Sequence, residues 1–71
     1  MKTETHRITL NGKPLDVPAA TTITQLLVLA GHAERRVAVE CNGEIVPRSR
    51  HELQELKAGD RVEIVQAIGG G

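Results

Sequence analysis

Two Asn-Gly dipeptides, Asn11-Gly12 and Asn42-Gly43, constrain the fold of this chain more than any other feature of its sequence. Each dipeptide lies between short segments in which apolar residues alternate with polar ones, the pattern of half-buried strands. A two-residue type I′ turn needs positive φ at both central positions, which Asn and Gly tolerate. The dipeptides therefore predict two β-hairpins, each with its register fixed by its turn.

The first hairpin is predicted within residues 5–17. Its turn sets Leu10 opposite Lys13 and Ile8 opposite Leu15. Because Pro14 has no N–H, we expect the second strand to lie at an edge of the sheet. Alternation then places two sets of side chains on opposite faces. One set is His6, Ile8, Leu10, Leu15 and Val17, and the other is Arg7, Thr9 and Asp16.

A short helix is predicted after the first hairpin. Thr22 and Gln25 have the spacing of a capping box, in which each side chain bonds to the other residue's main-chain amide. Gly31 suits the left-handed residue that ends a helix. The apolar residues between these signals have the 3–4 spacing of one helical stripe. They are Ile23, Leu26, Leu27 and Ala30.

The second hairpin is predicted to join residues 37–41 to residues 44–46, with Val39 facing Val46. The segment 48–56 has no clear period, and we expect a short helical turn around Glu52 and Leu53. A turn at residues 57–60 then precedes a run rich in β-branched residues, 61–67, which is predicted as the last strand.

The order hairpin, helix, hairpin, strand predicts an α+β protein with the β-grasp (ubiquitin-like) fold. In this fold a mixed sheet of about four to five strands packs against one helix. The first and last strands should lie side by side and parallel. A chain of 71 residues is too short for a second core. We therefore predict one β-grasp domain over residues 1–67, followed by a flexible glycine tail over 68–71.

The last strand carries apolar residues on both faces, Val62 and Ile64 on one and Val65 and Ala67 on the other. Two interpretations follow. Either the strand is central and covered on both sides, or Val65, Ala67 and Ile68 form an exposed patch that binds a partner. We favour the patch, because so short a chain has too little material to cover both faces of a sheet.

The composition argues against several classes of function. The chain has no Phe, Tyr or Trp to stack on bases, and its nine basic residues balance its nine acidic ones. We therefore expect protein partners, and neither nucleic acid nor a membrane. The chain contains one cysteine, no signal-peptide pattern and no apolar run long enough to cross a bilayer. These features predict a cytoplasmic protein.

The side chains that could carry chemistry favour structural roles. Cys41 falls on the same strand face as Val37 and Val39, where a small buried residue is expected. The three histidines lie in different elements without the spacing of metal ligands, so no metal site is predicted. The sequence shows no catalytic triad and no phosphate-binding glycine loop. We therefore predict that the protein is not an enzyme and binds no cofactor of its own.

The chain ends in three glycines, Gly69, Gly70 and Gly71, directly after the last predicted strand. Glycines pack poorly and lose much conformational entropy when ordered, so a structural role is weak. A tail without side chains can enter a passage that admits only backbone, and three extended residues reach about 10 Å. Such a tail presents the carboxylate of Gly71. The alternative is that the glycines are a linker stub or a cloning remnant.

Three segments together resemble the ThiS family of thiamin-pathway sulfur carriers. They are residues 39–48 (Val-Glu-Cys-Asn-Gly-Glu-Ile-Val-Pro-Arg), residues 59–65 (Gly-Asp-Arg-Val-Glu-Ile-Val) and the terminal glycines. The resemblance covers nearly the whole chain and implies that Gly71 bears the sulfur, that Gly70 enters partner sites with it, and that Gly69 is a spacer.

The resemblance also implies a set of partners. A ThiF-like adenylyltransferase would use ATP and Mg²⁺ to turn the Gly71 carboxylate into an acyl adenylate. Sulfur from a persulfide donor of the cysteine desulfurase type would then displace AMP and give a C-terminal thiocarboxylate. A ThiG-like thiazole synthase would take its sulfur from that group.

Other functions stay open at this point. A carrier for molybdopterin synthesis or tRNA thiolation shares the chemistry and differs in the acceptor, although the molybdopterin carrier typically has more aromatic residues. A ubiquitin-like tag would join its tail to a lysine. A non-catalytic β-grasp interaction module of the TGS type would not need the glycines.

Overall fold

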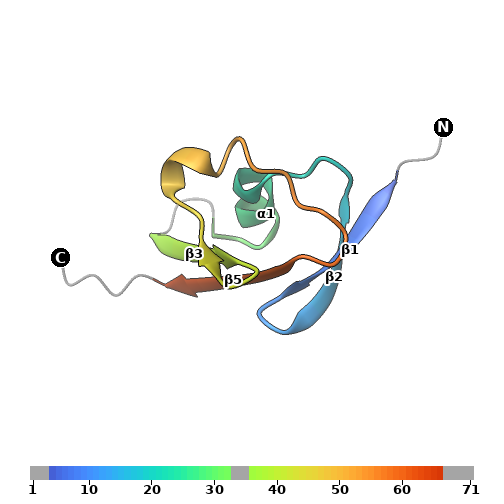
Figure 1. Cartoon of the computed structure of the whole chain (residues 1–71), viewed down its shortest axis with the longest axis horizontal. Coiled ribbons are helices and arrows are strands. Elements are labelled where there is room, and N and C mark those ends of the chain that lie inside the picture. The colour runs from blue at the N-terminus through green and yellow to red at the C-terminus, as the bar shows by residue number, and fades with distance from the viewer. Residues whose placement is uncertain (1–3, 33–35, 67–71) are drawn as a thin grey trace.

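The structure is a computed structural model that describes residues 4–32 and 36–66 (Figure 1). One mixed sheet of five strands, in the order β2-β1-β5-β3-β4, packs on one helix. The predicted β-grasp architecture is therefore confirmed. In chain order the elements are β1 (Thr5–Leu10), β2 (Lys13–Pro18), α1 (Ile23–Leu29), β3 (Val37–Cys41), β4 (Glu44–Ile45), the 3₁₀ helix η1 (Arg48–Arg50) and β5 (Arg61–Gln66).

The first and last strands, β1 and β5, are neighbours and run parallel, as predicted. Thr9 lies opposite Arg61 in this pair, whereas the other described strand pairs are antiparallel. The long connection through α1 provides the crossover that parallel pairing requires. Strand β5 is thus central, and β2 lies at an edge. The missing N–H of Pro14 in β2 therefore removes no bond from the sheet.

Both predicted Asn-Gly turns are present. The φ angles are 51° and 54° at the two asparagines and 84° and 85° at the two glycines, as a type I′ turn requires. The first turn sets Leu10 opposite Lys13, the predicted register. After the second turn the amide of Val46 donates to the carbonyl of Val39 at 2.8 Å, so these residues also face each other as predicted.

The side chains of the two turn asparagines also form hydrogen bonds to the main chain of β5. Asn11 Oδ1 accepts the N–H of Ile64 at 2.8 Å, and Asn42 Oδ1 accepts the N–H of Arg61 at 2.9 Å. Asn42 Nδ2 in addition donates to Asp60 Oδ1 at 3.0 Å. The turn pattern alone does not predict these bonds, because they depend on which strand lies beside each turn.

Helix α1 begins and ends at the predicted residues. Thr22 Oγ1 accepts the N–H of Gln25 at 3.2 Å, and Gln25 Oε1 accepts the N–H of Thr22 at 3.0 Å, which completes the capping box. Gly31 has φ of 81°. Its amide donates to the carbonyl of Val28, and the following amide donates to the carbonyl of Leu27 at 2.8 Å, a Schellman ending.

The connection after the second hairpin differs from the prediction in its starting point. A 3₁₀ helix, η1, begins directly after Pro47 and precedes the predicted turn around Glu52 and Leu53. Pro47 has φ of −59°, a value that its ring imposes and that leads easily into a helical turn. The predicted turn around Glu52 and Leu53 follows η1, because the amide of Gln54 donates to the carbonyl of Arg50 at 2.9 Å.

The core lies between α1 and one face of the sheet. Ile8 and Val17 of the first hairpin are each 1% exposed, whereas Arg7 and Asp16 on the opposite face form an exposed ion pair at 2.8 Å, so the predicted faces are confirmed. The core side chains are aliphatic apart from one thiol. They are Ile8, Val17, Ile23, Leu26, Leu27, Val39, Cys41, Val46, Leu56, Val62 and Ile64.

Candidate partner-binding face of the sheet

The two faces of β5 have different environments. Val62 and Ile64 are 0% and 9% exposed and belong to the core, whereas Val65 is 55% exposed on the opposite face. Strand β5 is therefore central in the sheet and yet covered on one side only. Val65 is therefore exposed, as the exposed-patch interpretation requires. Its role in binding a partner stays a prediction.

Within residues 4–32 and 36–66, Val65 lies with two other exposed apolar residues, Ala38 and Ile45, on the uncovered face. Ala38 of β3 lies directly opposite Val65. Ile45 of β4 lies opposite Glu40, which places it on the same face and diagonal to Ala38. Ile45 is 68% exposed. We call Ala38, Ile45 and Val65 the open-face patch.

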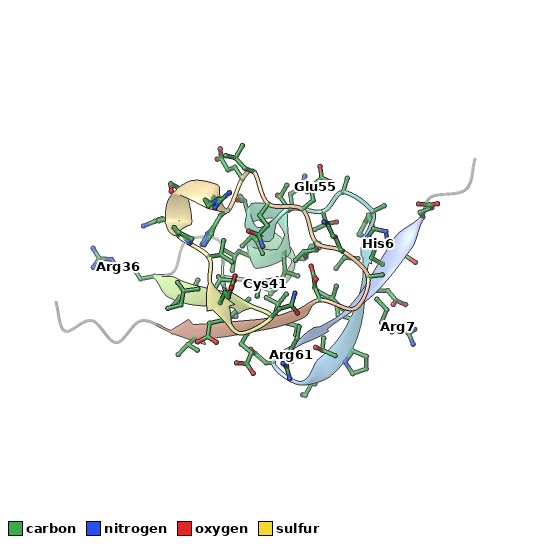
Figure 2. All side chains as sticks on the ribbon, in the orientation of Figure 1. His6, Arg7, Arg36, Cys41, Glu55 and Arg61 are labelled. Atoms are coloured by element: carbon green, nitrogen blue, oxygen red, sulfur yellow. The ribbon has the colours of Figure 1, made fainter. Side chains whose placement is uncertain are left out.

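Two carboxylates lie beside the open-face patch. Glu40 and Glu63 are directly opposite each other in the β3–β5 pair and point to the uncovered face. Like charges in this position repel each other. Over residues 4–32 and 36–66, neither takes part in a salt bridge. Arg61 projects from the same side of the sheet, away from α1 (Figure 2). A partner that places Lys or Arg next to apolar side chains would complement this face.

Sequence reasoning identified Val65 and missed Ala38 and Ile45. Part of the signal was present, since alternation within residues 37–41 turns Ala38 away from the core side of Val39. The register of the second turn likewise places Ile45 on the outer face. What the sequence did not show is that β3 lies next to β5, which brings these residues together.

The remaining predicted site residues lie outside the described residues. They are Ala67, Ile68, Gly69, Gly70 and Gly71. The predicted boundary between the domain and the tail lies there too. The structure does show how the chain approaches them, because β5 ends at Gln66, opposite Val37 at the start of β3. In Figure 1, β5 runs past the β1–β2 hairpin toward this end of the molecule.

Cys41 faces the interior, as predicted, and is 7% exposed (Figure 2). Burial, followed by the negative charge of Asp60, raises the pKa of the Cys41 thiol. A raised pKa keeps the thiol protonated at neutral pH, which suits packing and disfavours nucleophilic chemistry. His51 is also 7% exposed, and its Nε2 lies 3.0 Å from the carbonyl oxygen of Val46, a contact within the fold.

Two further observations concern the described part of the chain as a whole. In residues 4–32 and 36–66, no three His, Cys, Asp or Glu side chains are grouped closely enough to hold a metal ion. No helix formed by these residues is long and apolar enough to cross a membrane.

The strand order, the packing of helix α1 on the sheet and the uncovered sheet face define a ubiquitin-like β-grasp domain. The ThiS family model matches residues 5–71 of this domain. The chain therefore belongs to the ThiS family of sulfur carriers.

Solved structures and curated proteins agree with this assignment. The crystal structure of the thiamine biosynthesis protein ThiS from Geobacter metallireducens is 38% identical, with a TM-score of 0.76 over 92% of this chain and 99% of that one. A protein of Pyropia yezoensis named ycf40 is 30% identical over 90% of both chains. Thiazole synthases from Magnetococcus marinus and Paramagnetospirillum magneticum are each 42% identical over 65 residues. The chain spans 20% of the length of these two synthases.

Proposed function

We propose that this chain carries sulfur for thiazole synthesis in the thiamin pathway and that its working group is the carboxylate of Gly71. The observation that carries the proposal is the ThiS family match, which extends through the three terminal glycines to residue 71. The protein is then a substrate of partner enzymes and has no turnover of its own.

The chemistry begins with activation of the Gly71 carboxylate, which is a poor electrophile because it is negatively charged. In a ThiF-like adenylyltransferase, with Mg²⁺, a carboxylate oxygen attacks the α-phosphorus of ATP and pyrophosphate leaves. The terminal sulfur of a persulfide donor attacks the resulting acyl adenylate, and AMP leaves. A thiol then cleaves the acyl disulfide, which gives a thiocarboxylate at Gly71 and a disulfide on the donor.

The open-face patch supplies a surface for the adenylyltransferase. Val65 lies on the strand that leads into the tail, so an enzyme that holds the tail is also close to this residue. This patch of exposed apolar side chains lies next to the facing carboxylates of Glu40 and Glu63. Apolar and charged groups side by side are typical of a protein-binding surface. The combination favours a carrier that docks through its sheet face while its tail enters the enzyme.

The relatives favour thiazole synthesis over the other acceptors. In the two thiazole synthases, a segment similar to this chain makes up 20% of the polypeptide. A carrier domain within such a polypeptide is held close to the enzyme that would use its sulfur, as expected for a high effective concentration. We therefore propose a ThiG-like thiazole synthase as the acceptor, in preference to molybdopterin synthesis or tRNA thiolation.

Intact-mass spectrometry tests the proposal. The protein is incubated with ATP, Mg²⁺, a ThiF-like adenylyltransferase and a persulfide donor, and we expect one oxygen to be replaced by sulfur at Gly71. A variant that lacks Gly70 and Gly71 is the control. It should unfold at the same urea concentration as the full chain and gain no sulfur.

Two outcomes would contradict the proposal. Sulfur loading of the shortened variant would remove the terminal glycines from the chemistry. An unchanged mass of the full chain, with enzymes that load another ThiS family carrier, would favour the interaction-module alternative. If loading succeeds, loss of the sulfur to a thiazole synthase identifies the acceptor.

A further inference from the structure

The main-chain groups of β5 alternate between two neighbouring strands. The amide of Asn42 donates to the carbonyl of Arg61 at 2.7 Å, so residues 61, 63 and 65 direct their N–H and C=O groups toward β3. Residues 62, 64 and 66 direct theirs toward β1. Two bonds agree with this, from the amide of Asn11 to the carbonyl of Val62 at 2.9 Å and from the amide of Ile64 to Asn11 Oδ1 at 2.8 Å.

Among the described residues, those that pair with β5 on its β1 side extend as far as Asn11. The paired register of these two strands ends with Leu10 opposite Val62. The chain then turns into β2, which lies on the far side of β1 from β5. Beyond the Asn11 side chain, the C=O of Ile64 and the N–H of Gln66 point to a side on which the described residues form no strand. We call these two groups the free edge of β5.

We propose that the free edge of β5 pairs with an extended segment of the enzyme that receives the tail, so that the enzyme adds a strand to this sheet. The inference rests on the proposed function and names how the carrier docks. An exposed acceptor and donor at strand spacing fit an extended segment better than a helix, whose main-chain groups are already bonded.

The position of the free edge supports this occupant. The edge lies at the end of β5, and residues 67–71 follow it directly in the sequence, so an enzyme that holds the tail is close to this edge. Val65 lies between the two edge groups in sequence and points to the open-face patch. One partner can therefore contact the edge and the patch together. The edge is also short, a property that limits pairing between copies of a soluble protein.

Replacement of Gln66 by proline removes the hydrogen-bond donor of the free edge. The N–H of residue 66 makes no bond to β3, so Gln66→Pro should unfold close to the urea midpoint of the matched control Gln66→Ala, which keeps the amide. Loss of one main-chain bond in the complex should weaken binding to the adenylyltransferase about tenfold relative to the control. Equal affinities of the two variants would overturn the proposal.

Amide hydrogen exchange tests the same contact in the unaltered protein. In the free protein the amide of Gln66 should exchange rapidly, whereas the amide of Val65, paired with Ala38, should be protected. Binding of the adenylyltransferase should protect Gln66. If the unaltered protein binds and loads sulfur without this protection, the proposed strand pairing is wrong. If it neither binds nor loads sulfur, the proposed function fails instead. Protection of Gln66 that rises with concentration in the free protein would assign the edge to a second copy and also overturn the proposal.

Discussion

Val65 and Val28 are both exposed to solvent, but they lie in different parts of the molecule. Val65 is 55% exposed on the uncovered face of the sheet, and Val28 is 59% exposed on α1. Val28 lines a shallow groove with Pro18, Ala20 and Leu29. Neither valine is part of the core. Only Val65 lies on the strand that leads to the tail, so the two positions allow binding to be separated from stability.

We expect Val65→Asp to weaken binding of the adenylyltransferase about tenfold, because a charge would be buried in an apolar contact. The change in the free energy of unfolding should be about 1 kcal/mol or less, since Val65 is exposed. Val28→Asp is the matched control and should leave binding unchanged. Calorimetric titration and urea unfolding of both variants check this. Severe unfolding of Val65→Asp would place the residue in the core, and equal loss of binding in both variants would remove the patch from the interface.

Cys41 should make stability depend on alkaline pH. Burial raises the pKa of its thiol in the folded state, so the unfolded chain releases the thiol proton at lower pH than the folded protein does. The stabilisation is then complete below the thiol pKa of the unfolded chain, about 8.5, and is lost as pH rises through the folded pKa. Urea unfolding between about pH 7 and about pH 9.5 measures this. Cys41→Ala should lose less stability over that range, and an identical decline in both proteins would contradict the assignment.

At the scale of the elements, each hairpin turn also fixes a neighbouring strand. The Asn11 side chain accepts the amide of Ile64, and this bond extends the β1–β5 ladder where β1 has already turned away. The Asn42 side chain holds Arg61 at the other end of β5. The β5 strand is thus bonded through both turns, which positions the segment that leads to the tail.

Asn11 contributes to stability through its left-handed backbone conformation and through its side-chain bond to Ile64, and two substitutions separate these effects. Asn11→Gly keeps the positive φ and loses the bond to Ile64, at an expected cost of about 1 kcal/mol in the free energy of unfolding. Asn11→Ala loses the bond and also strains the left-handed backbone, which should cost about 1 kcal/mol more. Urea unfolding of the two variants measures both terms. Full stability of Asn11→Gly would mean that the side-chain bond contributes nothing.

At the scale of the whole molecule, one short helix covers one face of a five-stranded sheet. Helix α1 has seven residues, and with the segment that carries Leu56 it completes a core on that side. A chain of 71 residues supplies no second layer in the described part of the fold, so the other face stays in contact with solvent. The open-face patch is exposed because no second layer covers this face in the described part of the fold.

The sequence by itself determined the features that arise within a few neighbouring residues. The positive φ required at Asn11 and Asn42 set both hairpins and their registers, and the capping pair Thr22 and Gln25 with Gly31 set the limits of α1. The physical reason is that allowed backbone angles and local hydrogen bonds depend on residues close in the chain. The early start of η1 is local as well, because the ring of Pro47 restricts φ to −59°, a value that leads into a helical turn.

Only the tertiary structure decided that β3 lies beside β5 and where the predicted pairing of β1 with β5 ends. The pairing of β3 with β5 brings Ala38 and Ile45 to Val65, and the end of β1 at Asn11 leaves the C=O of Ile64 and the N–H of Gln66 free on one side. Strand order depends on how the whole core packs against α1, and no local pattern contains that information. The terminal glycines therefore indicated the chemistry from the sequence, whereas the surface that would present them to a partner became visible only in the fold.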